Sequence, residues 1–215
     1  LTYSFTPKNS GSSVNAVVVF PAPFGPAITH ISFILSLNRN GLISYFIFSL
    51  IIKIPINMNK QAFIFIGCYT RGVGSGAVIY TCRLDTQTGA LTPAAVCKDI
   101  ENPSFLALSH NGQYLYAVIE IDNFANQPSG GAAAFKINQQ TGELTLLNQQ
   151  ATHGVDPCHV IIDQTDSCVV VSNYTGGRAA GFSVHPDGSL NACQQRIQYQ
   201  GSSVHAREPN PHAPA

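Results

Sequence analysis

A block of strand-like sequence recurs three times between residue 58 and the end of the 215-residue chain. Pro103 of the first copy returns as Pro157 in the second, and Gly89 returns as Gly142 at nearly the same offset. A third copy begins at Gly177. A period of about 50 residues is typical of repeat architectures, in which each unit buries its faces only by stacking on its neighbours. The repeat therefore limits this part of the chain to an array of similar units.

Turn chemistry predicts that each unit is built from antiparallel strands. Thr88-Gly89 and Asp187-Gly188 stand between alternating apolar runs, and such pairs are hairpin signals. No segment after residue 58 keeps a helical period. About four strands per unit of about 50 residues is the pattern of a propeller blade. We therefore predict an all-β chain that forms a β-propeller with about three blades of an expected seven.

The N-terminal segment 1–57 differs in composition from the rest. It contains none of the eleven acidic residues and none of the six cysteines, and Met58, the single methionine, stands at the boundary. We predict that 1–57 is a leader outside the propeller, and that 58–215 form the N-terminal part of the propeller domain. An upstream translation artefact explains the leader best, and a targeting segment or an extra element is the alternative. Seven blades need roughly 350 residues, so we expect a truncated chain with little activity of its own.

Composition excludes two classes of partner. Charged residues make up 10% of the chain and the formal net charge is zero, so no basic stripe is available for nucleic acid. The apolar run 42–52 ends at Lys53 and is shorter than the roughly 20 residues that span a bilayer. We expect neither nucleic acid nor a membrane as a partner.

The cysteines indicate a reducing compartment. None is spaced as in C-x-x-C, which disfavours zinc and redox motifs, and no metal-ligand cluster or Ser/His/Asp arrangement is recognisable. Several lie inside strand-like runs, as Cys168 does, where a reduced thiol packs as a small hydrophobic group. We expect a cytoplasmic protein that works without a metal or other cofactor.

Positions at which the copies differ are available for a function that the fold does not require. Phe105 of the first copy becomes His159 in the second, directly after the matching proline and its neighbour. Imidazole titrates near neutral pH and can accept a proton from water, so His159 is the candidate general base. A histidine that is only hydrogen-bonded at the end of a blade is the alternative.

Two further candidates follow the second strand of each copy. Ile119-Glu120 in the first copy corresponds to Asn173-Tyr174 in the second. Glu120 can serve as an acid or a base, and Asn173 can donate to a ligand oxygen. A solvated strand end for Glu120 and a tight turn between blades at Asn173 are the alternatives.

The third copy contains an insertion. The segment from turn glycine to proline runs over 89–103 in the first copy and over 142–157 in the second, but over the longer stretch 188–211 in the third. Insertions in repeat proteins form loops on one face, which is often the binding face. Arg207 in this loop can bind a phosphate or carboxylate in bidentate fashion or stabilise an oxyanion, unless it is simply an exposed surface arginine. His212 is a weaker candidate.

Five short segments point to a family when they are taken together. They are IGCYT (66–70), NPSFL (102–106), GQYLYAV (112–118), PCHV (157–160) and SNYTGG (172–177). In this order they resemble the consecutive signature segments of the lactonase family with a seven-bladed β-propeller fold, of the 6-phosphogluconolactonase type. The resemblance covers nearly all of 58–215. It also places His159, Asn173, Arg207 and His212 in segments at the mouth of the central channel.

The chain departs from the family near its end. Where the family continues as Arg-Gln, two residues, then Pro-His-Ala-His, this chain has Glu208 and Pro214 at the second and last of these positions. The second family histidine is therefore missing.

The resemblance implies lactone chemistry, with a small phosphorylated sugar lactone as the partner molecule. We expect a longer parent protein to hydrolyse 6-phospho-D-glucono-1,5-lactone to 6-phosphogluconate, in the oxidative pentose phosphate pathway. His159 is expected to act as the base toward water, and Arg207 to hold the oxyanion or the phosphate. Asn173, His212 and Glu120 are expected to bind the substrate. A carboxymuconate-cyclising enzyme and a non-catalytic propeller that binds a partner are the alternatives.

Overall fold

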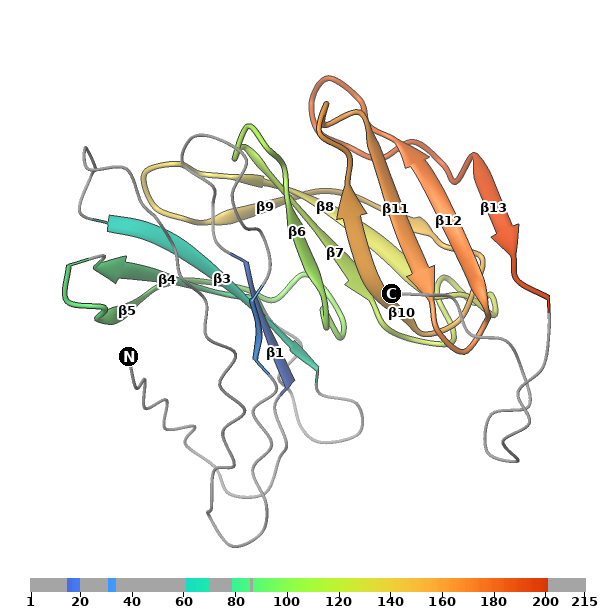
Figure 1. Ribbon diagram of the computed structural model, residues 1–215, viewed down its shortest axis with the longest axis horizontal. Helices are drawn as coiled ribbons and strands as arrows, with labels where there is room; N and C mark the ends of the chain where they lie inside the picture. Colours follow the sequence, from blue (N-terminus) through green and yellow to red (C-terminus); the bar gives the residue numbers. More distant parts are fainter. Residues whose placement is uncertain (1–14, 20–30, 34–60, 70–78, 86, 201–215) are drawn as a thin grey trace, which may run out of the picture.

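Three antiparallel sheets make up the computed structural model, which describes residues 15–19, 31–33, 61–69, 79–85 and 87–200 (Figure 1). The first sheet has the strand order β2-β1-β3-β4-β5, the second β6-β7-β8-β9 and the third β10-β11-β12-β13. The second sheet lies between the other two (Figure 1). Within the described ranges there is no helix long and apolar enough to cross a bilayer. The prediction of an all-β chain built from three similar units is confirmed.

The strands of each sheet follow one another along the chain. The first sheet contains β1 (Asn15–Val19), β2 (Ile31–Phe33), β3 (Gln61–Tyr69), β4 (Ile79–Asp85) and β5 (Leu91–Cys97). The second contains β6 (Leu106–Leu108), β7 (Tyr114–Ile119), β8 (Gly131–Ile137) and β9 (Leu144–Ala151). The third contains β10 (Pro157–Ile162), β11 (Cys168–Asn173), β12 (Arg178–Ser183) and β13 (Gln195–Gln198).

A strand from the N-terminal part of the chain takes the place of β6 and β10 in the first sheet. β1 pairs antiparallel with β3, in the same way as β6 pairs with β7 and β10 with β11. β2 then pairs with the other edge of β1 and is the edge strand of the sheet. Both strands fall within the predicted leader, 1–57, and the boundary near residue 58 stays a prediction.

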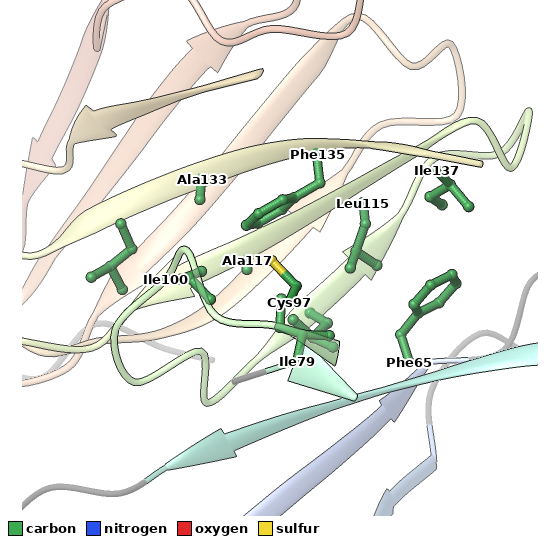
Figure 2. Packing of buried hydrophobic residues seen from close by; sticks show 11 residues of the cluster. Phe65, Ile79, Cys97, Ile100, Leu115, Ala117, Ala133, Phe135 and Ile137 are labelled. Atoms are coloured by element: carbon green, nitrogen blue, oxygen red, sulfur yellow. The ribbon is translucent and has the colours of Figure 1, made fainter. Parts of the chain in front are cut away.

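Alternation along the strands gives each sheet two packing faces. In β7, Leu115, Ala117 and Ile119 face the first sheet, and Tyr116 and Val118 face the third. This is the two-residue period of a strand that is buried on both sides. Figure 2 shows the first interface, where side chains from the first sheet meet those of the second: Phe65, Ile79, Cys97, Leu115, Phe135 and Ile137. Each large apolar side chain buried there contributes about 1.5–3 kcal/mol.

A turn glycine in each later sheet reaches back to the sheet before it. Gly142 (φ 77°) and Gly188 (φ 87°) occupy equivalent hairpin turns in the left-handed region, which glycine adopts without strain. The Thr81 hydroxyl donates to Gly142 O at 2.9 Å, and the Tyr116 hydroxyl donates to Gly188 O at 3.1 Å. Burial raises the pKa of Tyr116, which keeps its hydroxyl protonated as a donor. We call these two contacts the glycine locks.

A carboxylate adds a polar tie between the second and third sheets. Asp166, in the turn between β10 and β11, accepts from the backbone N–H of His110 at 2.7 Å and of Asn111 at 3.0 Å. Its Oδ1 also lies 3.1 Å from Nδ1 of His110. The tie and the glycine locks lie at the same end of the sheets, because all involve turns that follow the ends of β8, β10 and β12.

Asp163 organises the same β10–β11 turn and is expected to make stability depend on pH. Its Oδ1 accepts from the N–H groups of Ser167 and Cys168, both at 2.7 Å, and the Thr165 hydroxyl donates to its Oδ2. The Thr165 hydroxyl contributes most to a pKa well below the usual carboxyl range, and these N–H groups add to it. A carboxyl group whose pKa is lower in the folded state than in the unfolded state contributes its full stabilisation above the unfolded-state pKa of about 3.9. This contribution is lost as the pH falls toward the folded-state pKa.

Urea unfolding of the wild type and of Asp163→Asn at pH 7 and pH 3 measures this effect. We expect Asp163→Asn to have a lower free energy of unfolding than the wild type at pH 7. We expect this difference to shrink at pH 3, because protonation of the carboxyl group then begins to remove the extra stability of the wild type. A difference that stays constant across this range would contradict the assignment.

Candidate active site

Strand ends from two sheets meet at the end opposite the glycine locks. β7 and β11 end there, and their neighbours β6 and β10 begin there, because each pair is antiparallel. The inner strands β6 and β10 also contact one another. This arrangement brings together Ser104 and Phe105, Glu120, and Cys158 and His159.

The backbone is the same in the two copies at this place. Glu120 N donates to Asn102 O at 3.1 Å, and Tyr174 N donates to Asp156 O at 3.0 Å. Asn102 and Asp156 both have a positive φ, 43° and 52°. The backbone hydrogen bonds are therefore the same in the two copies, while the side chains differ. This is expected where one copy of a repeated fold has acquired functional residues.

His159 lies in β10, next to a β-bulge that shifts the pairing register between Pro157 and His159. Bulges redirect side chains at strand ends and are common beside active sites. The His159 side chain is half-buried, and its ring packs edge-on against Phe105 with 4.3 Å between the ring centroids. The aromatic contact restricts the orientation of the imidazole near the start of β10, and its role as a general base stays a prediction.

Glu120 is held by a serine that the sequence comparison did not single out. The Ser104 hydroxyl donates to Glu120 Oε2 in a short hydrogen bond, and Asn102 Nδ2 donates to the Glu120 main-chain oxygen at 3.4 Å. Both Ser104 and Glu120 are half-buried. The repeat did contain a signal for Ser104, because the equivalent residue in the next copy is Cys158.

The Glu120 carboxylate also influences the neighbouring sheet. Burial raises the pKa of the Cys158 thiol, and the negative charge of Glu120 raises it further. Val118, two residues before Glu120, packs against the third sheet, so strand alternation places Glu120 on the face of the second sheet that is turned toward Cys158 and His159.

Asn173 is fully buried and lies against the loop that precedes β10. Its Nδ2 donates to Arg178 O at 3.2 Å, while its Oδ1 has no hydrogen-bond partner among the described residues. A Cβ on Gly154 would come within 2.7 Å of Cγ of Asn173. The position corresponds to the apolar Ile119 of the first copy, and an unsatisfied buried acceptor there costs about 1–3 kcal/mol. Its role toward a substrate stays a prediction.

The remaining predicted site residues are outside the described part of the chain. Arg207 and His212 both fall in 201–215. Of the three described candidates, His159 and Glu120 are half-buried at these strand ends and Asn173 is fully buried. Among the described residues, no group of three or more His, Cys, Asp or Glu side chains is arranged to hold a metal ion. All six cysteines are described and unpaired, and burial raises the pKa of Cys68 to about 11.

A shallow groove of about 230 Å³ lies elsewhere, on the outer face of the third sheet. Val170, Gly181 and Ile197 line it, and their side chains or backbone face away from the second sheet. Val170 and Gly181 pair with one another and correspond by register to Tyr116 and Ala134, which face the next sheet in the second copy. The groove therefore belongs to a packing face and lies apart from His159 and Glu120.

Known relatives of this chain share both sequence and fold with it. It is 35% identical over 148 residues to the 6-phosphogluconolactonase of Bacillus subtilis, covering 69% of this chain and 40% of the relative. It is 36% identical over 141 residues to the 6-phosphogluconolactonase of Formosa agariphila, covering 65% of this chain and 38% of the relative. The chain thus spans about 40% of the length of these relatives.

Solved structures agree with this result. A putative 6-phosphogluconolactonase from Bacteroides uniformis matches with a TM-score of 0.63 and 32% identity, over 72% of this chain and 43% of that one. A periplasmic gluconolactonase from Pseudomonas aeruginosa matches with a TM-score of 0.59 and 26% identity, over 68% and 41%. These matches confirm the predicted partial β-propeller.

The family model described as lactonase, 7-bladed beta-propeller, matches residues 63–214. The match contains all three repeat copies and every candidate site residue, which confirms the resemblance found in the sequence. The chain therefore belongs to the lactonase family with a seven-bladed β-propeller fold.

Proposed function

We propose that this chain supplies one part of the active site of a lactonase that hydrolyses 6-phospho-D-glucono-1,5-lactone to 6-phosphogluconate. His159 takes a proton from water, the resulting hydroxide attacks the lactone carbonyl, and the ring C–O bond breaks as the ring oxygen gains a proton. Arg207 stabilises the oxyanion or binds the phosphate, and Glu120, Asn173 and His212 contact the substrate.

The observation that supports this proposal most is the replacement of Phe105 by His159 on an otherwise repeated backbone. The second sheet carries an apolar ring at this place and the third sheet carries an imidazole, which packs against that ring, while Ser104 next to Phe105 holds the Glu120 carboxylate. A lactone is an activated ester, so a base and an oxyanion contact are sufficient in principle for its hydrolysis. Both curated relatives carry the name of this activity.

The setting of the reaction is also a proposal. Six unpaired thiols, three of them buried, fit a reducing compartment such as the cytoplasm, and the substrate would be a small phosphorylated sugar of the pentose phosphate route. Export of the protein to an oxidising compartment in a localisation experiment would contradict this part.

An assay of the longer protein that contains this chain tests the proposal. We expect base consumption in a pH-stat to show hydrolysis of 6-phosphogluconolactone well above its spontaneous rate. Turnover of carboxymuconate instead would favour a lactone-forming enzyme, in which Arg207 holds a carboxylate. No turnover of either substrate, together with specific capture of a protein partner, would favour a binding module.

A further inference from the structure

The Ser104–Glu120 pair is not required by the fold. The next sheet has Cys158 and Tyr174 at the equivalent places and keeps the same backbone hydrogen bonds. The hydrogen bond from a serine hydroxyl to a half-buried carboxylate is therefore found in one of the two copies and not in the other. Forming the pair costs free energy, because the carboxylate is partly desolvated and two side chains lose rotamer freedom. The neighbouring sheet has the same backbone hydrogen bonds without such a pair, so the fold does not require it.

The pair restricts the position of the carboxylate. The Ser104 hydroxyl donates to Oε2 of Glu120, which limits the rotation of the carboxylate about its side chain. Val118, two residues before Glu120, packs against the third sheet, so strand alternation places Glu120 on the face of the second sheet that is turned toward the strand of His159. A carboxylate has about four acceptor positions on its two oxygens, so it can accept from a ligand hydroxyl while Ser104 holds Oε2.

We propose that Glu120 is a specificity-determining residue that binds ring hydroxyls of the lactone, and that Ser104 is the positioning residue that holds it there. This inference rests on the proposed function, because it assigns the substrate class of the same site. A carboxylate held at this end of the sheets accepts hydrogen bonds from a polyhydroxylated ring and repels a ring that bears a carboxylate there. The site therefore selects sugar lactones over carboxylated lactones.

Kinetics with Glu120→Gln test this selection without a change of side-chain shape. The KM for 6-phosphogluconolactone and the inhibition constant of a carboxylated lactone, carboxymuconolactone, are measured on the longer protein. We expect KM to rise about tenfold or more with a smaller change in kcat, because a charged hydrogen bond to the substrate is lost. The inhibition constant of the carboxylated lactone is expected to fall.

Ser104 variants separate positioning from a merely structural role. Ser104→Ala is expected to shift KM in the same direction by a smaller factor, and Ser104→Thr, which keeps the hydroxyl, is expected to restore it. Thr141 and Glu143 provide a matched control, because the Thr141 hydroxyl donates to the Glu143 carboxylate at 3.1 Å in an exposed turn away from the site. Glu143→Gln is expected to leave both constants unchanged.

The outcomes distinguish this inference from the function on which it rests. If the wild type hydrolyses 6-phosphogluconolactone and Glu120→Gln leaves KM and the inhibition constant unchanged, the role of Glu120 is overturned and the proposed function stands. If the wild type hydrolyses no lactone, the proposed function fails and this inference fails with it. A rise in KM that Ser104→Thr does not restore would overturn the positioning role of Ser104.

Discussion

His159→Phe is expected to reduce kcat/KM for 6-phosphogluconolactone by about 10²- to 10⁴-fold, the usual contribution of a positioned general base. The substitution installs the residue that the first copy carries at this place, Phe105. The backbone frame accepts a phenyl ring there, so the fold is expected to survive while the proton acceptor is lost. The measurement is initial-rate hydrolysis by the longer protein, with circular dichroism to check the fold.

A second histidine provides the control for this variant. His185 lies in the turn that follows β12, at the other end of the sheets from His159. His185→Ala is expected to keep wild-type kcat/KM. Hydrolysis by His159→Phe at the wild-type rate would show that the imidazole is not the base, and the replacement of Phe105 would then need a structural explanation.

Gly188→Ala is expected to destabilise the protein by about 2–5 kcal/mol, because a backbone contribution and a packing contribution add. The residue has a φ of 87°, where an L side chain is strained by about 1–2 kcal/mol. A Cβ there would also lie 2.2 Å from Cδ1 and 2.3 Å from Cε1 of Tyr114, so the ring or the turn must move. Overpacking of this kind adds about 1–3 kcal/mol.

Gly112→Ala separates the two causes. Gly112 has a similar φ of 69°, but a Cβ on it would meet no atom within 4 Å. We expect this variant to lose only the backbone contribution, about 1–2 kcal/mol. Urea unfolding of both variants measures the difference. Equal losses would mean that the contact with Tyr114 contributes nothing and that the glycine lock is not a packing constraint.

The internal repeat made most of the fold predictable from the sequence. Thr-Gly and Asp-Gly turns are local signals, and glycines 89, 142 and 188 all adopt the positive φ that such turns need. The addition of β1 and β2 to the first sheet could not be predicted, because it depends on long-range pairing with β3 rather than on local pattern. Which segment pairs with an exposed strand edge depends on the other segments of the chain that could also pair there.

Candidate site residues could be chosen from the sequence where the copies differ, but the direction of their side chains could not be predicted. His159 and Glu120 were chosen because each replaces a residue of another chemical type in the repeat, and their roles stay predictions. The burial of Asn173 was not expected, although its equivalence to Ile119 was noted, because the face on which a strand residue lies depends on register. Ser104 was missed because serine and cysteine look like a conservative exchange when its contact with Glu120 is unknown.

The two ends of the sheets carry different groups of residues. The glycine locks and the Asp166 tie hold neighbouring sheets together at one end, and His159 and Glu120 lie at the other. The glycine locks and the Asp166 tie do not involve His159 or Glu120, so substitutions of these two residues are expected to leave those contacts in place. In such an array, one sheet can therefore change a side chain at this end while the contacts at the other end still hold it to its neighbour.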